Sequence, residues 1–147
     1  MPLIRIIYVS AAISPFSPEH LRQLLSKARV HNSSKGISGL LLYHHQSFFQ
    51  ILEGEEHVVS SLFYLIERDK RHDRVVLLSK ETVPQRNFGD WSMGFVDTEH
   101  TLGKLPGFRR LMRAKSSFLE LQGESKLVVR LIDGFHEGRW RQSINQE

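Results

Sequence analysis

The stretch that decides the fold is "ISGLLLYHHQSFFQILEG", residues 37–54. Two apolar runs, residues 37–43 and 48–53, flank the short polar turn "HHQS", and this pattern predicts a β-hairpin. In the second run Gln50 shares a strand face with Phe48 and Leu52, because neighbouring strand residues alternate between faces. A buried amide without partners costs about 1–3 kcal/mol, so Gln50 is expected to have a specific hydrogen-bonding partner.

One amphipathic helix is predicted on each side of this hairpin. Residues 17–30, "SPEHLRQLLSKARV", begin with Ser17, a preferred N-cap, and Pro18, which suits the first helical position. We expect this helix to end in "HNSSKG", with Asn32 after it and Gly36 in the turn. Residues 55–69, "EEHVVSSLFYLIERD", predict the second helix, whose acidic start the helix dipole favours. The inward stripes are Leu21, Leu24, Leu25 and Ala28 in the first helix, and Val58, Val59, Leu62, Phe63 and Ile66 in the second.

Three further strands are predicted at residues 3–10 ("LIRIIYVS"), 74–83 ("RVVLLSKETV") and 91–96 ("WSMGFV"). The order βαββαββ predicts an α+β, ferredoxin-like sandwich with a five-stranded sheet and two helices on one face. In this topology the first and third strands are neighbours, so Tyr8 and Gln50 can lie side by side. The tail carries apolar residues at helical spacing, and we expect its helices to cover the other face. The chain therefore divides into residues 1–98 and a C-terminal extension, 99–147.

The composition limits the classes of protein to which the chain can belong. It has 147 residues, 40% of them hydrophobic, which predicts a packed core. It has no cysteine, which excludes disulfides and cysteine-ligated metal sites. No apolar run has the length of a signal peptide core or a membrane span, so a soluble, cytoplasmic protein without membrane contact is expected. The net charge is +4, but the basic residues are mostly interleaved with acids.

Four positions stand out as polar residues in apolar surroundings: Tyr8, Asn32 and Gln50, on the predicted helical side of the sheet, and Trp91, at the start of the last strand. One interpretation is structural, with Tyr8 and Gln50 bonded to each other in the core and Asn32 capping a helix. The other is a planar polar ligand between the two helices. Asn32 and Gln50 would then offer donors and acceptors to the ring edge, while Leu24 and Ile66 packed on its faces.

The segments "IYVS", "ARVHNSSKGISGLLLY", "FFQILEG", "VVSSLFYLIERDKRH" and "WSM" occur in this order over about residues 3–97. In these segments the sequence resembles the BLUF family of blue-light sensors that use FAD. The resemblance implies a non-covalently bound flavin whose ring lies between the two helices of a ferredoxin-like fold. It also implies a photoreceptor that is not an enzyme and signals through a homo-oligomer or a downstream protein, with no room in residues 99–147 for an enzymatic domain.

The resemblance assigns roles residue by residue. Tyr8 matches the photoactive tyrosine, and Gln50 the glutamine between it and the flavin N5 and C4 carbonyl. Trp91 and Met93 match the last-strand pair that relays the signal. Two positions depart from the pattern of many members: His31 replaces an asparagine, and Leu65 stands where some members have an arginine. The implied flavin-binding residues are His31, Asn32, Gln50, Leu24, Ile66, Asp69, Arg71 and His72, the last three near the ribityl and phosphate portion.

A mechanism also follows from the resemblance. Light drives an electron and then a proton from Tyr8 to the flavin. After recombination the Gln50 amide is left rearranged, with its donor and acceptor exchanged by rotation or tautomerisation. The flavin absorption shifts slightly to the red. Trp91 and Met93 then pass the change to the last strand, and the tail reads it.

Three other functions remain as alternatives. A ferredoxin-like module could bind RNA or a small ligand without photochemistry, but the strands lack the aromatic and basic RNA-binding pattern, so nucleic acid is not expected. A transfer enzyme would need a glycine-rich phosphate loop or a nucleophile beside a base, and Ser10 has neither in sequence. A histidine metal site is not expected, because His44, His45, His57 and His72 lack ligand spacing.

Overall fold

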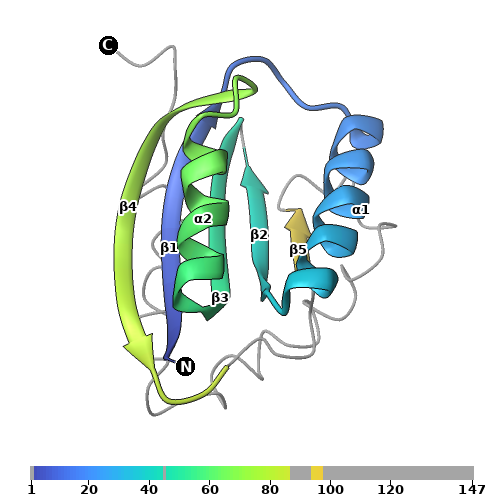
Figure 1. Cartoon of the computed structure of the whole chain (residues 1–147). Coiled ribbons are helices and arrows are strands. Elements are labelled where there is room, and N and C mark those ends of the chain that lie inside the picture. The colour runs from blue at the N-terminus through green and yellow to red at the C-terminus, as the bar shows by residue number, and fades with distance from the viewer. Residues whose placement is uncertain (1, 45, 87–93, 98–147) are drawn as a thin grey trace.

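The structure is a computed structural model that describes residues 2–44, 46–86 and 94–97 (Figure 1). The elements follow the order βαββαββ, and the first six form the split βαβ arrangement. The elements are β1 (Leu3–Ala12), α1 (Pro18–Lys35), β2 (Ser38–His44), β3 (Ser47–Glu55), α2 (Glu56–Glu67), β4 (His72–Val83) and β5 (Gly94–Asp97).

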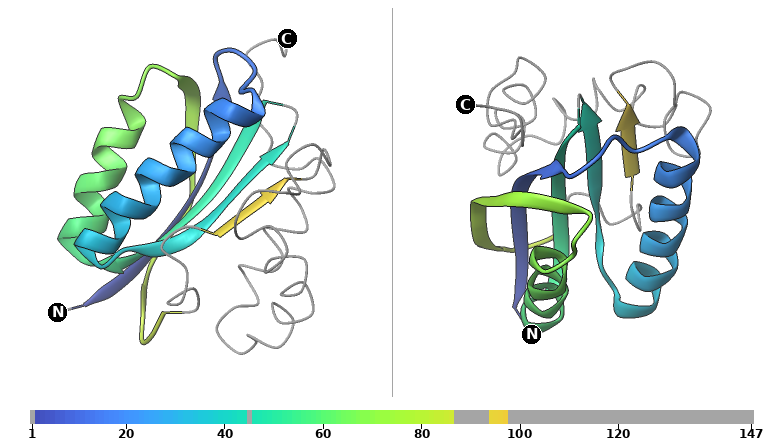
Figure 2. Two further views of the ribbon diagram at one scale, coloured as in Figure 1. Left: turned by 90° about the vertical axis from the view of Figure 1, so that its right-hand side faces the viewer. Right: turned by 90° about the horizontal axis from the view of Figure 1, so that it is seen from above.

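The sheet has the strand order β4-β1-β3-β2-β5. The strands β2, β3, β1 and β4 pair antiparallel, and β5 pairs parallel with β2. The two helices lie on the same face of the sheet, as Figure 2 shows. Two helices against a four-stranded antiparallel sheet confirm the ferredoxin-like arrangement that the sequence predicts. The predicted C-terminal helices, and the start of the last strand at Trp91, lie outside the described residues.

Helix α1 begins as predicted and ends later than predicted. The Ser17 side chain accepts a hydrogen bond from the His20 backbone N–H at 3.1 Å, and Pro18 opens the helix. Gly36 adopts a left-handed conformation, φ 69°, and ends the helix. The expectation that Asn32 follows the helix is wrong, because the polar segment "HNSSK" stays helical as far as this glycine. The Ile37 N–H donates to the Asn32 carbonyl at 2.9 Å, which closes the C-terminus.

The hairpin forms as predicted, although its turn lacks glycine. Strands β2 and β3 pair with Leu41 opposite Gln50 and Tyr43 opposite Phe48. Gln46, in the turn, has φ 62°, a conformation that non-glycine residues seldom adopt.

Both faces of the sheet are buried along its central strands, whereas most residues of β4 are exposed or half-buried. The helical face is packed by the predicted stripes, with Leu21, Leu25 and Val59 fully buried and the other stripe residues partly buried against the core. On the opposite face, which we call the far face, the buried residues of the three central strands include two charged ones. The buried far-face residues are Arg5, Ile7, Val9, Ala11, Ser38, Leu40, Leu42, Ser47, Phe49, Ile51 and Glu53, and the charged ones are Arg5 and Glu53.

Within the part of the chain that the structure describes, none of the helices has the length and apolar character needed to cross a bilayer.

Candidate functional site

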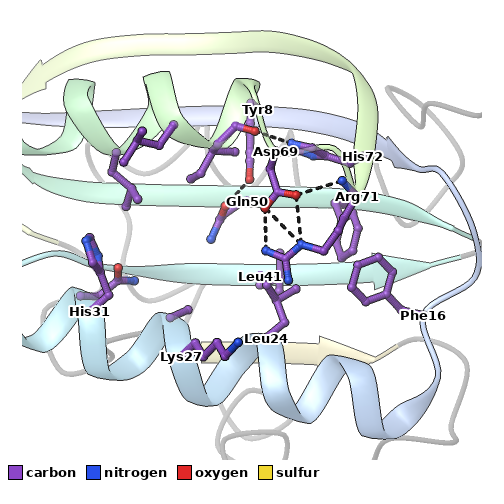
Figure 3. Close-up of a pocket in the computed structure, with 16 residues that line it drawn as sticks. Tyr8, Phe16, Leu24, Lys27, His31, Leu41, Gln50, Asp69, Arg71 and His72 are labelled. Atoms are coloured by element: carbon purple, nitrogen blue, oxygen red, sulfur yellow. Dashed lines mark hydrogen bonds and ion pairs between the residues drawn. The ribbon is translucent and has the colours of Figure 1, made fainter.

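A cavity of about 290 Å³, which we call the ring cavity, lies between α1 and α2 above the centre of the sheet (Figure 3). Its apolar walls come from Leu24 and Ala28 of α1 and from three residues of α2. Its floor comes from side chains of β1, β2 and β3 that point toward the helices. The α2 residues are Leu62, Leu65 and Ile66, and the floor residues are Tyr8, Leu41, Phe48 and Gln50.

Tyr8 and Gln50 form a buried pair on the cavity floor. They are directly opposite each other in the β1–β3 register, and the Tyr8 hydroxyl donates to Gln50 Oε1. The Phe63 ring packs edge-on against the Tyr8 ring, with centroids 5.4 Å apart. Burial raises the pKa of Tyr8 far above its usual range, and the nearby Asp69 carboxylate raises it further. Tyr8 is therefore a neutral phenol, and its hydroxyl donates a hydrogen bond to an amide oxygen.

Asn32 and His31 reach the ring cavity from the last turns of α1. Asn32 is only 2% exposed, whereas His31 is exposed at one end of the cavity (Figure 3). Two primary amides, Asn32 and Gln50, thus line one cavity from a helix and from a strand. Because each amide carries both donors and an acceptor, the pair suits a ring with alternating carbonyl and N–H groups.

Charged groups lie where the loop after α2 joins the cavity. Arg71 makes a two-contact ion pair with Asp69, with Nη2–Oδ2 at 2.6 Å and Nε–Oδ1 at 3.0 Å. This hydrogen bonding holds the pKa of Asp69 below its usual range and raises the pKa of Arg71. The two side chains therefore stay oppositely charged at neutral pH.

His72 is fixed by hydrogen bonds at both ring nitrogens. Its Nδ1 lies 2.7 Å from Ser10 Oγ, and its Nε2 lies against the Ile66 carbonyl oxygen. A carbonyl can only accept, so Nε2 carries a proton, and in the neutral ring Nδ1 accepts from the Ser10 hydroxyl. His72 thus joins β1 to the C-terminal end of α2 beside Tyr8.

The structure brings nearly all of the predicted site residues to this one cavity. Trp91 and Met93 lie outside the described residues, so their place is a prediction only. The predicted residues that line the ring cavity are Tyr8, Leu24, His31, Asn32, Gln50, Ile66, Asp69, Arg71 and His72.

The sequence interpretation missed two lining residues that matter for the cavity's shape and charge. Phe16, the residue before the N-cap, packs edge-on against Phe48 with centroids 5.1 Å apart. Its place before the N-cap, where apolar residues often pack back on the helix, could have indicated this. Lys27 lies three residues after Leu24 on the same side of α1.

Across residues 2–44, 46–86 and 94–97, no three or more His, Asp or Glu side chains are grouped to hold a metal ion.

Comparisons with known proteins agree with one another. The family described as "Sensors of blue-light using FAD", or BLUF, matches residues 3–94. The subunit beta of the photoactivated adenylate cyclase of Euglena gracilis is 34% identical over 91 residues, which are 60% of this chain and 11% of that protein. The blue light- and temperature-regulated antirepressor BluF of Escherichia coli is 32% identical over 95 residues, 65% of this chain and 24% of that protein. The chain thus spans a small part of the length of these relatives.

Solved structures show the same likeness. The dark-state structure of BlrB, a BLUF protein, has a TM-score of 0.65 at 31% identity, covering 86% of this chain and 90% of that one. Klebsiella pneumoniae BlrP1 with FMN and cyclic diGMP has a TM-score of 0.74 at 29% identity, covering 92% of this chain and 35% of that one. With a family match over more than half of its length, the chain belongs to the BLUF family of blue-light sensors that use FAD.

Proposed function

We propose that the protein is a blue-light photoreceptor that binds FAD non-covalently in the ring cavity and signals by rearranging the Gln50 amide. The observation that carries the proposal is the buried Tyr8–Gln50 hydrogen bond on the floor of a cavity with apolar walls. The neutral phenol of Tyr8 can donate an electron and a proton. The Gln50 amide in contact with it can exchange its hydrogen-bond donor and acceptor reversibly.

The residues that line the cavity fit a flavin. Asn32 and Gln50 would hold the polar edge of its ring, and Leu24 and Ile66 from opposite helices would pack on its faces. Asp69, Arg71 and His72 would hold its ribityl and phosphate portion, and His31, at the other end of the cavity, would stack on or hydrogen-bond the ring. A bound flavin supplies absorption of blue light and an excited state that oxidises a nearby phenol.

Tyr8 is suited to give up an electron and a proton together. Because burial raises its pKa, the hydroxyl keeps its proton in the dark and cannot lose it to solvent as a phenolate. Its proton already points at Gln50 Oε1, so Gln50 lies on the path by which the proton leaves and returns. Tyr8 recovers both particles at the end, and the protein undergoes no net redox change.

The Gln50 side-chain amide is the group that would remain rearranged after the electron and proton return to Tyr8. With Oε1 facing Tyr8, the amide accepts from the phenol. After rotation or tautomerisation the nitrogen side of the amide would face Tyr8, and Oε1 would lie elsewhere in the cavity. The two arrangements are nearly isosteric, so contacts around the amide decide which is populated. Trp91 and Met93 would pass this difference to the last strand.

Residues 99–147 would cover the far face and carry the output, as contacts within a homo-oligomer or with a downstream protein rather than as an enzymatic activity. What supports this is the complete burial of far-face residues such as Arg5, Ile7 and Ile51. Helices α1 and α2 cover only the opposite face (Figure 2).

The visible absorption spectrum of the purified protein, before and after blue light, tests the proposal. We expect a flavin spectrum that shifts to the red and returns in the dark. Tyr8→Phe and Gln50→Leu should each abolish the shift and leave flavin bound. Tyr64→Phe, which removes an exposed phenol outside the cavity, should keep it. A protein that stays colourless after incubation with FAD would contradict the proposal.

A further inference from the structure

Arg86 follows β4 and binds the two strands that lie beyond β1 in the sheet. Its Nη1 donates to the Glu53 backbone carbonyl oxygen at 3.1 Å and to Ser38 Oγ at 3.2 Å. Ser38 of β2 and Glu53 of β3 are directly opposite each other in the strand register. Because β1 separates β4 from β3, this one guanidinium nitrogen joins the chain after β4 to two strands with which β4 does not pair.

The place of this link follows from the topology of the sheet. β4 and β5 lie at opposite edges, so the chain between them has to pass one end of the other strands. β4 ends at Val83, and Pro84, which has no backbone N–H to pair, follows it. Figure 1 shows the chain leaving β4 and running along the end of the sheet where β3 ends and β2 begins. Arg86 lies on this crossing.

The link is a fixed attachment rather than a loose surface contact. Arg86 is half-buried, and the Ser38 side chain that accepts from it is buried. The other acceptor belongs to Glu53, whose fully buried carboxylate accepts from Arg5 Nε at 2.9 Å. A charged donor also forms stronger hydrogen bonds than a neutral one. Glu53 is thus held at its side chain by Arg5 and at its backbone carbonyl by Arg86.

Arg86 closes a short loop of chain onto β2. Arg86 is bonded to Ser38 before the loop, and Gly94 of β5 pairs with Leu40 after it. Ser38 and Leu40 are next-but-one neighbours in β2, so residues 87–93 begin and end at neighbouring places on one strand. Closing a chain in this way removes many of the arrangements that it could otherwise adopt.

The closed segment contains the two residues to which the proposed function assigns signal relay, Trp91 and Met93. The strands to which Arg86 attaches it also position Gln50: Glu53 is in the same strand as Gln50, and Leu41 of β2 is opposite Gln50. Contacts around the amide decide which of its two arrangements is populated. A segment attached to these strands can therefore favour the rearranged amide, and a released segment favours it less.

We propose that Arg86 is a positioning residue for the light signal. By attaching the segment 87–93 to β2 and β3, it keeps Trp91 and Met93 within reach of Gln50 and prolongs the lit state, in which the amide is rearranged. The proposal rests on the proposed function, because it takes a flavin in the ring cavity and a rearranged Gln50 as the result of illumination.

The rate at which the red-shifted flavin spectrum returns in the dark tests the proposal. Arg86→Gln should speed this recovery about two- to tenfold, the effect on a rate of losing one net hydrogen bond. The size of the red shift should stay unchanged, because Arg86 does not line the ring cavity. Arg86→Lys keeps a charged donor and should restore most of the wild-type lifetime of the lit state. Arg74→Gln, at an exposed arginine of β4, is the matched control and should change neither quantity.

Ser38→Ala separates loss of this link from general loosening of the fold. It removes one of the two acceptors of Arg86 Nη1, so it should speed recovery in the wild type. In the Arg86→Gln background the link is already lost, and Ser38→Ala should have no further effect.

Recovery at the wild-type rate in Arg86→Gln would overturn this inference, and if that variant does not fold, the same result in Ser38→Ala would do so. Additive effects of Arg86→Gln and Ser38→Ala, or equal acceleration in Arg74→Gln, would overturn it too. In each of these cases the wild type still shifts to the red, and the proposed function stands. A wild type that binds no flavin or shows no red shift would instead overturn the proposed function, and this inference with it.

Discussion

Tyr8 and Gln50 satisfy each other's hydrogen-bonding groups in a place where water cannot. An amide can accept through oxygen or donate through nitrogen, and a phenol can do either as well. Tyr8 can therefore pair with whichever atom of the Gln50 amide faces it, so the hydroxyl keeps a hydrogen-bond partner in both amide orientations. A small difference in surrounding contacts is enough to select one orientation, which is what a switch requires.

The buried phenol predicts an alkaline limit to stability. Folding raises the pKa of Tyr8 above its unfolded value of about 10. The phenol's contribution to stability is thus fully present below about pH 10 and lost as the pH rises from there toward the folded-state pKa. Between about pH 9 and pH 11 we expect the free energy of unfolding to fall more steeply for the wild type than for Tyr8→Phe.

Urea denaturation followed by circular dichroism at a series of pH values measures this difference. The slopes, rather than the absolute stabilities, are compared, because Tyr8→Phe also removes the hydrogen bond to Gln50. Tyr64→Phe is the control and should follow the wild type, since Tyr64 is 55% exposed. Parallel curves for the wild type and Tyr8→Phe would contradict the prediction.

At the scale of the elements, the hairpin and the helix starts could be predicted from the sequence, but one helix end could not. The order of elements places Tyr8 beside Gln50, and the structure confirms this pairing. The polar run before Gly36 resembles a loop, yet α1 continues through it to the first residue that adopts a left-handed conformation easily. Asn32 is therefore held by a helix and buried, which composition alone could not indicate.

Lys27 shows the other limit of prediction from sequence. A lysine beside an apolar stripe is ordinarily read as a solvent-facing residue. It lines the ring cavity here only because α1 and the loop after α2 leave a space between them, and that spacing depends on the whole fold.

The β2–β3 pairing depends on a close approach at Gly39. A Cβ atom at this position would collide with the Ile51 carbonyl oxygen of the neighbouring strand. A backbone oxygen within a sheet cannot move aside as a flexible side chain can, so we expect Gly39→Ala to destabilise the fold by about 1–3 kcal/mol. Urea denaturation measures the loss.

Gly36→Asn provides the comparison for this prediction. Gly36 is left-handed, but the nearest neighbouring atom to an added Cβ is 3.9 Å away, and asparagine tolerates this conformation. We expect it to be clearly less destabilising than Gly39→Ala. Equal losses for the two variants would show that the space at Gly39 does not control the pairing.

At the scale of the whole molecule, the two faces of the sheet have different contents. The helical face contains a cavity, whereas the far face contains a row of charged side chains across three strands. Arg5 of β1 donates to Glu53 of β3 at 2.9 Å and to Glu81 of β4 at 3.1 Å. Arg5 and Glu53 are fully buried, and Arg5 Nη2 has no hydrogen-bond partner among the described residues. This row joins the strands that carry Tyr8 and Gln50.

Removing one member of the buried pair should destabilise the protein more than removing both. Among the described residues, Glu53→Leu leaves the buried Arg5 charge with the 37% exposed Glu81 as its one ion-pair partner, and we expect a loss of about 3–5 kcal/mol. Arg5→Met together with Glu53→Leu removes both buried charges and should recover most of that loss. Glu81→Gln should cost less than Glu53→Leu, because solvent screens its contact with Arg5. Urea denaturation of the four proteins decides the matter: a double variant as unstable as Glu53→Leu would mean that packing of the far face, and not the buried charge, sets the cost.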